Sequence, residues 1–372
     1  MQIIDIELEQ FIYLNFLLSI KSIGPKRLIN IIKKYPSIVE LRKANNKHLE
    51  NIDLLSNIIA NYILSSLSNY FKYEKLFSSH YDYCLKNNIS IIPYWSEKYP
   101  KQLSEIDDPP ILIYLKGDIT SYNENSIAIV GTRNPTHYGK TQTEILTKDL
   151  VNNNITIVSG LALGIDTIAH NTALKYNGKT IAIIGSGLDI IYPSQNKTLS
   201  EKIIENGILI SEYSLGTQPN PENFPRRNRI ISALSKAVLV IETRMNGGAI
   251  ITAKIAISQN KKLYAIPGNI SSEMSDGTNF LIKTNKAKLI TSANDIIEDL
   301  GLFAKMDKKD LSKLSLGIFE LEIMNLLNDE PKHIDDVARN LNLSTQDTLV
   351  SLLNLEFEGL IKQLPGKYFI KL

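Results

Sequence analysis

The sequence predicts an α/β protein built on a doubly wound parallel sheet, with a helical region before it and a small unit of helices and a hairpin after it. Two observations lead to this prediction. Between about residues 110 and 300, short β-branched runs alternate with helical stretches of about 10–15 residues. On both sides of this region, apolar residues recur at helical spacing instead.

Residues 1–105 are predicted to form an N-terminal helical domain. Helical periodicity is clear in FIYLNFLLSI, RLINIIKKY and LLSNIIANYILSSL. The stretch KSIGPKRLINIIKKY is typical of a helix–hairpin–helix, with Gly24-Pro25 in the hairpin. Lys26 and Arg27 then either contact phosphate beside a helix start or belong to a purely structural hairpin. Prolines break the pattern and mark a linker at Pro93, Pro100, Pro109 and Pro110.

Residues 106–300 are predicted to form the core, in which seven strands are expected. Their runs are nearly continuous in apolar residues, as strands buried on both faces should be. Helical segments between several of them make βαβ units of a parallel sheet. The runs are SIAIVG, ITIVSG, TIAIIG, GILIS, AVLVIE, KLYAIPG and AKLIT.

The C-terminal part is predicted to be a Lys-rich linker over residues 301–317 followed by a winged helix over residues 318–372. FELEIMNLLN has the pattern of a helix, and HIDDVARNLNLSTQDTLVSLLNLEFEGL that of helix, turn, helix with Ser344 as an N-cap. A hairpin with Pro365-Gly366 at its tip follows. Nine acids oppose five bases here, and the second helix has no lysine or arginine. Phosphates would repel such a helix, so we expect it to contact protein or to inhibit its own chain.

Length and composition narrow the function further. The 372 residues suggest two or three domains, and the net charge of +2 means that a nucleic-acid site must be a local patch. One cysteine, Cys84, excludes an internal disulfide framework and fits a reducing compartment. The first residues carry acids, unlike a signal peptide, and no apolar run reaches membrane-spanning length. We therefore expect a cytoplasmic protein.

The unusual residues of the core follow its strands, where parallel sheets bind ligands. Glycines there let backbone approach a ligand closely, and helix starts offer free N–H groups to phosphates. Arg133 follows the first strand, and Arg226, Arg227 and Arg229 crowd one stretch without a carboxylate among them. These features converge on one phosphate-binding crevice.

Each feature also has a structural interpretation. A glycine after a strand is common in any α/β protein, and Arg226 is expected in solvent. Asp166 is expected to orient a helix start, and Glu212 and Glu242 to pair with the arginines. His137 and His170 lack the spacing of metal ligands, so no metal is expected. No set of nucleophile, base and orienting residue is evident.

The common nucleotide motifs do not fit. Seven residues separate Gly131 from Gly139-Lys140-Thr141, where a Walker A loop needs four. Gly178-Lys179-Thr180 precedes a strand instead of following one. Gly185-Ser186-Gly187 lacks the third glycine of a dinucleotide fingerprint. We therefore expect no cofactor.

Six ordered motifs in the core resemble DNA-processing protein A, the DprA/Smf family. They are VGTR (130–133), SGLALGID (159–166), GSGLDIIYPSQN (185–196), SEY…G…P…FPRRNRII (211–231), GGAIITAKIA (247–256) and AIPG (265–268). Two positions depart from frequent family patterns. Ser194 stands where a lysine often follows Tyr-Pro, and Gly247 where many members have serine.

The resemblance implies an extended Rossmann-like core, a helical N-terminal domain of SAM or helix–hairpin–helix type, and a C-terminal winged helix. It also implies a homodimer, here expected through residues 249–290, that binds single-stranded DNA and helps load the RecA recombinase in natural transformation, without catalysis. The residues implied in DNA binding are Gly131, Thr132, Arg133, Ser159, Gly160, Gly164, Gly185, Gly187, Asn196, Arg227, Asn228, Arg229, Gly247 and Gly248. Phe224 is the nearest aromatic for base stacking, although a place in the core is favoured for it.

An enzyme is the rival interpretation. Rossmann-like nucleotide phosphoribohydrolases also place glycines at strand ends, and are expected to carry a Pro-Gly-Gly…Gly-Thr…Glu loop. The nearest stretch here, NGGAIITA (246–253), has no glutamate after its threonine.

Overall fold

The computed structural model describes residues 2–118, 125–302, 318–327, 331–357 and 360–371. The chain divides into two compact units, Met1–Phe303 and Ala304–Leu372. The predicted linker over residues 301–317 lies almost wholly outside the described residues. None of the described helices is long and apolar enough to cross a membrane.

The first unit is built on a nine-stranded sheet with the order β1-β2-β6-β5-β4-β3-β7-β8-β9. The strands from β6 to β9 are parallel, whereas β1 and β2 are antiparallel additions at one edge. Their bounds are β1 (Ile89–Pro93), β2 (Leu112–Gly117), β3 (Ser126–Val130), β4 (Thr156–Ser159), β5 (Thr180–Ile183), β6 (Ile208–Ser211), β7 (Ala237–Val240), β8 (Lys262–Ala265) and β9 (Lys288–Leu289). All seven strands expected in the core are confirmed.

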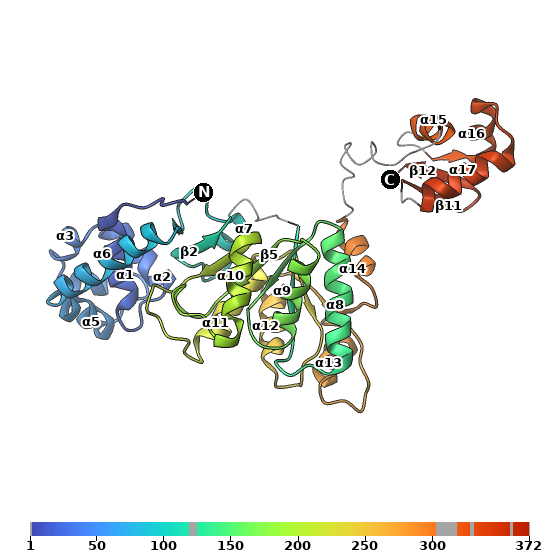
Figure 1. The fold of residues 1–372 in the computed structure, drawn as a ribbon. Helices are drawn as coiled ribbons and strands as arrows, with labels where there is room; N and C mark the ends of the chain where they lie inside the picture. Colours follow the sequence, from blue (N-terminus) through green and yellow to red (C-terminus); the bar gives the residue numbers. More distant parts are fainter. Residues whose placement is uncertain (1, 119–124, 303–317, 328–330, 358–359, 372) are drawn as a thin grey trace. The chain divides into compact units, whose positions relative to one another are not determined.

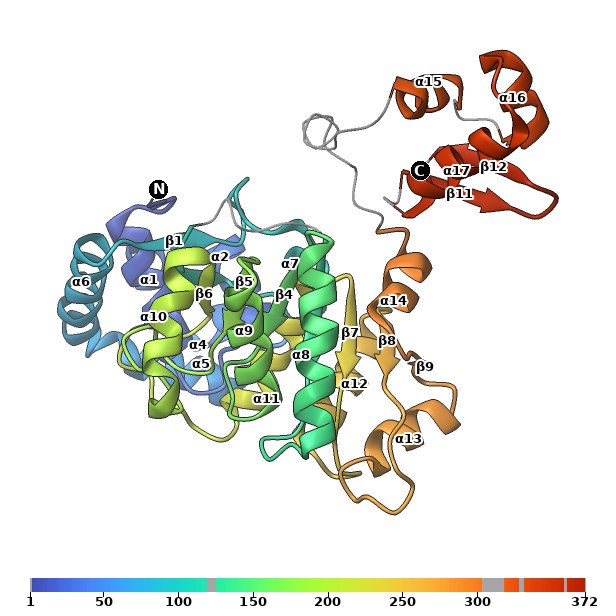
Figure 2. The ribbon, with the colours of Figure 1, turned by 45° about the vertical axis from the view of Figure 1, so that its right-hand side comes forward.

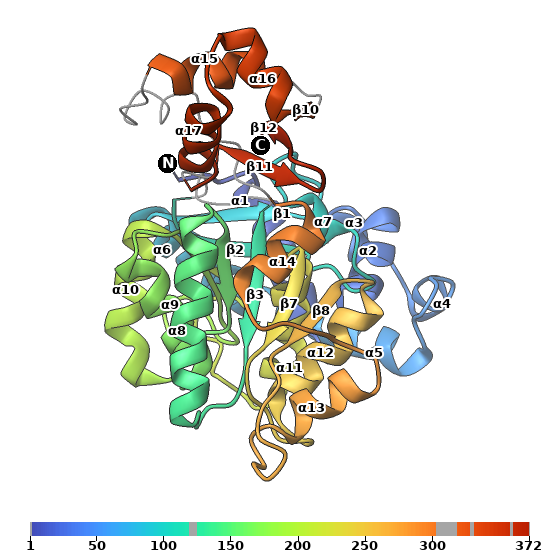
Figure 3. The ribbon, with the colours of Figure 1, turned by 90° about the vertical axis from the view of Figure 1, so that its right-hand side faces the viewer.

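Helices cover both faces of this sheet (Figure 3). One face carries α8 (His137–Asn152), α9 (Ile165–Lys175), α10 (Lys197–Asn206) and α14 (Ala293–Leu300). The other carries α7 (Lys101–Ser104), α11 (Asn223–Ala233), α12 (Gly248–Ser258) and α13 (Asp276–Lys283). Alternate residues of one strand serve the two faces: Ile127 and Ile129 of β3 pack toward α8, and Ala128 toward α11 and α12. This two-sided burial is why the strands are continuous in apolar residues.

The N-terminal helices lie against the β1–β2 edge (Figure 1). They are α1 (Leu8–Ser19), α2 (Pro25–Lys34), α3 (Ile38–Leu41), α4 (Asn46–Glu50), α5 (Asn57–Leu67) and α6 (Tyr70–Lys86). The expectation of a mostly helical stretch to residue 105 missed β1. Pro93 ends this edge strand, where proline is tolerated, instead of lying in a linker.

Two hairpins in this helical part are built alike. Ser22, between α1 and α2, and Leu54, between α4 and α5, both have left-handed backbone, with φ of 67° and 70°. Arg27 ties the two together, because its Nε donates to Leu54 O at 2.9 Å and its Nη1 to Ser22 O at 2.6 Å. The predicted helix–hairpin–helix is therefore present, and Arg27 holds its hairpins.

The second unit is a small domain with its own core (Figure 2). It contains α15 (Ile318–Leu326), α16 (Ile334–Leu341), α17 (Thr345–Phe357) and a sheet of order β10-β12-β11, with β10 (Lys332–His333), β11 (Ile361–Leu364) and β12 (Tyr368–Lys371). Ser344 caps α17, since its Oγ accepts from Asp347 N at 3.1 Å. The helix–turn–helix followed by a hairpin is confirmed.

Candidate functional site

A crevice opens where the order of the sheet reverses. The chain proceeds from β3 through β4 and β5 to β6 on one side, and from β7 through β8 to β9 on the other, while β3 and β7 are paired. Ligands of open α/β sheets bind outside the carboxyl ends of strands at such a point. The crevice has a volume of about 580 Å³ and is lined by the loops after β3, β4 and β7 and the starts of α11 and α12.

The N-terminus of α12 faces this crevice without a side-chain cap. Gly247 is the N-cap residue and makes no side-chain hydrogen bond. The N–H groups of Gly248 and Ala249 donate to no described residue. A Cβ added at Gly248 would meet no heavy atom within 4 Å, so this helix start is open. Uncapped N–H groups and the positive end of the helix dipole together suit a phosphate.

Arg133 also lines the crevice and lies beside two aromatic rings. Its guanidinium is 5.8 Å from the ring centroid of Phe224, and no carboxylate within the described ranges pairs with it. The rings of Phe224 and Tyr192 are 5.5 Å apart, and Tyr192 is 44% exposed. Phe224 is half-buried and lines the crevice, so it does not lie in the core as favoured from the sequence. Tyr192 lines the crevice but was not among the site residues expected from the sequence, although it lies in a strand-end motif.

Arg227 lines the crevice with only a small exposed fraction, because its side chain is almost fully buried. Its Nη1 donates to the carbonyl oxygens of Gly160 and Ile183, at the ends of β4 and β5. Burial lowers the pKa of Arg227 to about 10, and the nearby Asp166 acts in the opposite direction. The guanidinium therefore stays charged at neutral pH. A Cβ at Gly160 would lie 2.5 Å from Arg227 Nη1, so this glycine makes room for the arginine.

Arg229 is not in the crevice. Its Nη2 lies 2.5 Å from Glu212 Oε2, and its Nε lies 3.4 Å from Asp108 Oδ2. The expected pairing of Glu212 with an arginine is thus confirmed. Arg226 is 43% exposed and reaches Glu212 only at 4.0 Å, as expected for a largely solvated side chain.

Two carboxylates near the crevice hold the loops around it. Asp166, in the first turn of α9, accepts from the N–H groups of Gly160 at 3.1 Å and Ala162 at 3.3 Å, as expected for a residue that orients a helix start. Glu242 does not pair with an arginine, which corrects the expectation from the sequence. It accepts from Thr136 N at 2.9 Å and Thr136 Oγ1 at 2.5 Å, and so fixes the start of α8.

The other residues implied in DNA binding fall into two groups. Buried members support the loops. Ser159 donates to Ile129 O, and Asn196 donates to Leu161 O and to Thr167 Oγ1. Gly185 leaves room for Phe224, and Gly187 leaves room for Asp189. Gly164 has a φ of 79°, and a Cβ added there would lie within 2.5 Å of the carbonyl oxygens of Thr132 and Arg133. Accessible members line the crevice, namely Gly131, Thr132, Arg133, Asn228, Gly247 and Gly248. Contact of either group with DNA stays a prediction.

The second unit has a different surface. Along α17, the side chains of Leu349, Val350, Leu353 and Phe357 are exposed, Phe357 by 89%. The helix carries Asp347 and Glu356 but no lysine or arginine. An apolar and acidic helix face is unsuited to a phosphate backbone.

Comparison with known proteins gives the family. Residues 90–301 match the family model of DNA recombination-mediator protein A, and residues 315–367 that of the DprA winged helix domain. Protein Smf of Escherichia coli is 37% identical over 76% of this chain and 77% of its own. DNA processing protein DprA of Bacillus subtilis is 42% identical over 58% of this chain and 72% of its own.

Solved structures agree. The X-ray structure of DprA from Streptococcus pneumoniae is 32% identical and aligns with a TM-score of 0.67 over 80% of this chain and 99% of that one. DprA from Helicobacter pylori, whose structure is described for its single-stranded DNA binding mode, is 35% identical, with a TM-score of 0.53 over 57% of this chain and 95% of that one. The fold, the crevice and these matches together show that this chain belongs to the DNA recombination-mediator protein A family, also called DprA or Smf.

Proposed function

We propose that this protein is a cytoplasmic recombination mediator that holds single-stranded DNA in the crevice. It protects incoming strands and helps load RecA during natural transformation, without catalysis. The proposal rests on one observation. Arg133, which has no carboxylate partner among the described residues, and the uncapped start of α12 line the same crevice. Both groups recognise phosphate, and neither reads a base.

The division of roles follows from exposure. Arg133, Asn228 and the N–H groups at Gly248 contact phosphate, while Phe224 and Tyr192 offer a platform on which bases stack. The buried Arg227 acts by adding positive potential and by fixing the ends of β4 and β5. Arg229 holds its loop through Glu212. Binding is therefore largely independent of sequence and sensitive to salt.

The relatives support the same assignment. The family is described as a recombination mediator, and the Helicobacter pylori protein binds single-stranded DNA. Because the crevice residues of this chain lie in the region that matches the family model, the same ligand is the best supported one here.

A nucleotide phosphoribohydrolase is the alternative, and the geometry favours it less. Such an enzyme needs a carboxylate or another acid–base group aimed at the sugar. Among the described carboxylates near the crevice, Asp166 lines it and accepts hydrogen bonds from Gly160 and Ala162, Glu242 accepts from Thr136, and Glu273 pairs with Arg244. Thr252, the threonine of the closest stretch, is buried in α12.

The decisive experiment compares ligands. Fluorescence anisotropy would be measured with oligo-dT, a matched duplex and mononucleotides at two salt concentrations. We expect oligo-dT to bind most tightly and to weaken as salt rises. Cleavage of a mononucleotide without oligo-dT binding would overturn the proposal in favour of the enzyme.

RecA loading needs its own test. On single strands already covered by a single-strand-binding protein, RecA shows a lag before its DNA-dependent ATP hydrolysis begins. We expect the wild-type chain to shorten this lag and Arg133→Ala to shorten it less. An unchanged lag with the wild-type chain would remove RecA loading from the proposal and leave DNA binding untouched.

We also propose a homodimer formed through residues 249–290. Apolar side chains are exposed along this stretch, among them Ile257, Phe280 and Leu289. Sedimentation equilibrium at micromolar concentration should give a dimer, and Ile257→Glu should shift it toward monomer. A monomeric wild-type chain would exclude this interface.

The boundary between an N-terminal domain (1–105) and the core (106–300) is likewise a proposal. The β1–β2 pair spans this boundary, and Tyr114 of β2 packs among the N-terminal helices. A limited-proteolysis cut near residue 105 that leaves both fragments folded would support this boundary, and a chain that resists cleavage there would argue against it.

A further inference from the structure

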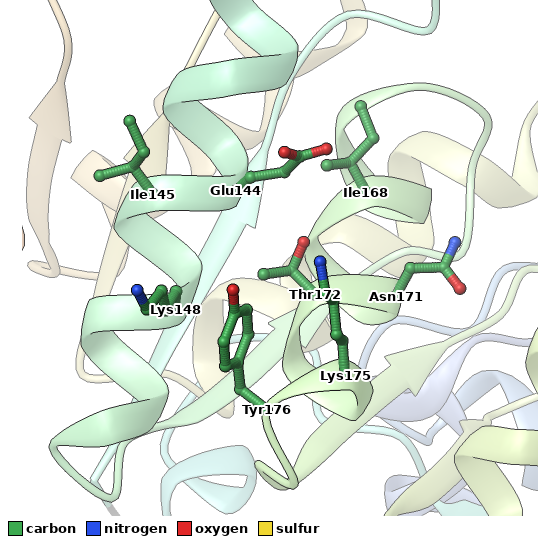
Figure 4. Close-up of a pocket in the computed structure, with 8 residues that line it drawn as sticks. All are labelled: Glu144, Ile145, Lys148, Ile168, Asn171, Thr172, Lys175 and Tyr176. Atoms are coloured by element: carbon green, nitrogen blue, oxygen red, sulfur yellow. The ribbon is translucent and has the colours of Figure 1, made fainter.

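A second hollow lies between α8 and α9, outside the crevice (Figure 4). Its volume is about 400 Å³. One side is formed by Glu144, Ile145 and Lys148 of α8, and the other by Ile168, Asn171, Thr172, Lys175 and Tyr176. We refer to it as the α8–α9 groove.

The groove lies farther along the two helices whose first turns border the crevice, and its nearest lining residue on α8, Glu144, is eight residues or about 12 Å from Thr136. The start of α8 is fixed by Thr136 to Glu242, directly after β7, and Ile165 N at the start of α9 donates to Thr132 O at 3.2 Å. Both helices follow parallel strands and therefore run away from the crevice side by side (Figure 4). From Thr136 to Lys148 is twelve residues, or about 18 Å along α8.

Positive charge in the groove is not neutralised. Lys148 and Lys175 form no ion pair with a carboxylate in the described part of the chain. Glu144 is the one acid that lines the groove, and it stands four residues from both Lys140 and Lys148 on α8. Two lysines and one glutamate therefore line the groove, and its lining carries a net positive charge.

An aromatic ring lies between two of these lysines. Tyr176 is 37% exposed, and its ring centroid is 5.4 Å from Lys148 Nζ and 5.6 Å from Lys175 Nζ. Its hydroxyl group makes no hydrogen bond with a described residue. An exposed ring beside two ammonium groups is suited to a ligand that combines phosphate with a flat base.

We propose that the α8–α9 groove is a second contact for a single strand that leaves the crevice. Lys148 and Lys175 bind its phosphates, and Tyr176 packs against a base. This inference rests on the proposed single-strand binding of the crevice. A free mononucleotide has the same chemistry, so the test must separate it from a strand.

The test is a length series of oligo-dT, from about 4 to about 16 nucleotides, titrated against the full chain by anisotropy. The variant is Lys148→Glu/Lys175→Glu. Its matched control is Lys72→Glu/Lys86→Glu, which changes the net charge equally through two exposed lysines of α6.

We expect the groove variant to bind the shortest strand as the control does, and the longest strand about ten- to a hundredfold more weakly. Its salt slope for the longest strand should fall by about 1.4 units, as two lost phosphate contacts predict. Tyr176→Leu should lose about five- to a hundredfold on long strands, and Tyr176→Phe should retain binding, because it keeps the ring.

Three outcomes would overturn the inference. The first is a length dependence equal to that of the control, which would leave the crevice as the whole site. The second is a lower melting temperature of the groove variant with unchanged oligo-dT binding, which would show that the two lysines stabilise the packing of α8 against α9. The third is dTMP binding, measured by dialysis, that is lost in the groove variant without any effect on strands. If the wild-type chain binds no oligo-dT at all, the proposed function fails as well, which is a distinguishable result.

Discussion

Arg229 and Glu212 form a buried ion pair, with 2.5 Å between Nη2 and Oε2. Their side chains are 10% and 6% exposed, so neither charge has water as an alternative partner. Asp108 lies 3.4 Å from the Nε atom of the same arginine. An arginine that already has two carboxylate partners is poorly suited to a phosphate, although the family resemblance implies that role for it.

Arg229→Ala should therefore lower stability and spare binding. Breaking a buried pair from one side costs about 3–5 kcal/mol, or about 5–8 °C in melting temperature for a unit of about 300 residues. Glu212→Gln should show a smaller loss of the same kind. Thermal melts and oligo-dT titrations below the melting transition check both. If Arg229→Ala melts normally but binds DNA poorly, Arg229 is a phosphate ligand after all.

Arg133→Ala should weaken DNA binding and leave the melting temperature unchanged. A charge-assisted contact is worth about 1.5–3 kcal/mol, so binding should weaken about ten- to a hundredfold, equally for dT, dA and mixed strands. The salt slope should fall by about 0.7 units. Arg133→Lys should recover part of the affinity, because lysine lacks the planar fork. The control is Arg42→Ala, which removes another arginine that lies over an aromatic ring, 5.3 Å from the Tyr70 centroid.

The sequence was sufficient to predict the sheet and the place of the crevice. Its strands are continuous apolar runs, and every loop with an unusual glycine or arginine followed one of them. The edge strands β1 and β2 were missed. ISIIP of β1 is too short to be told from the end of the preceding helix, and LIYLKG of β2 directly follows the prolines interpreted as a linker.

The roles of the three clustered arginines could not be predicted from composition. They lie on α11, where each residue turns the side chain by about 100°. Arg226 consequently points to solvent, Arg227 to the ends of β4 and β5, and Arg229 to Glu212. The solvated position of Arg226 was expected, but the structural roles of Arg227 and Arg229 depend on the phase of the helix on the sheet, which the sequence does not give.

The aromatic pair gives a prediction that does not depend on charge. Phe224→Leu and Tyr192→Leu should each weaken oligo-dT binding about five- to a hundredfold, since stacking is worth about 1–3 kcal/mol per base. The salt slope should stay unchanged, unlike that of Arg133→Ala. Phe71→Leu on α6, where the ring is 74% exposed, is the matched control and should bind normally. Normal binding by both crevice variants would show that bases do not stack there.

The C-terminal unit should be dispensable for single-strand binding. Its helix α17 has no lysine or arginine, and the crevice lies wholly in the first unit. A chain ending at residue 303, where the first compact unit ends, should bind oligo-dT within about threefold of the full chain. Circular dichroism would verify that the shortened chain is folded. A loss beyond tenfold in a folded chain would assign the winged helix a direct part in binding.

His170 should make the protein sensitive to mild acid. It is fully buried, its Nδ1 lies 2.7 Å from Thr180 Oγ1, and burial, aided by the charge of Arg227, lowers its pKa to about 3. An unfolded histidine titrates near pH 6.5, so between about pH 6.5 and pH 3 the unfolded chain binds a proton that the folded chain excludes. Stability from this group is thus present above pH 6.5 and is lost as the pH falls.

From pH 7 to pH 5 the loss should be about 2 kcal/mol. Urea unfolding at both pH values checks it, with His170→Asn as the variant. The asparagine loses stability at every pH because it leaves a cavity, but the drop between pH 7 and pH 5 should be about 2 kcal/mol smaller than in the wild-type chain. His137→Asn, at an exposed position on α8, should keep the wild-type drop. Equal drops in the wild-type chain and His170→Asn would mean that His170 takes up its proton without unfolding the core.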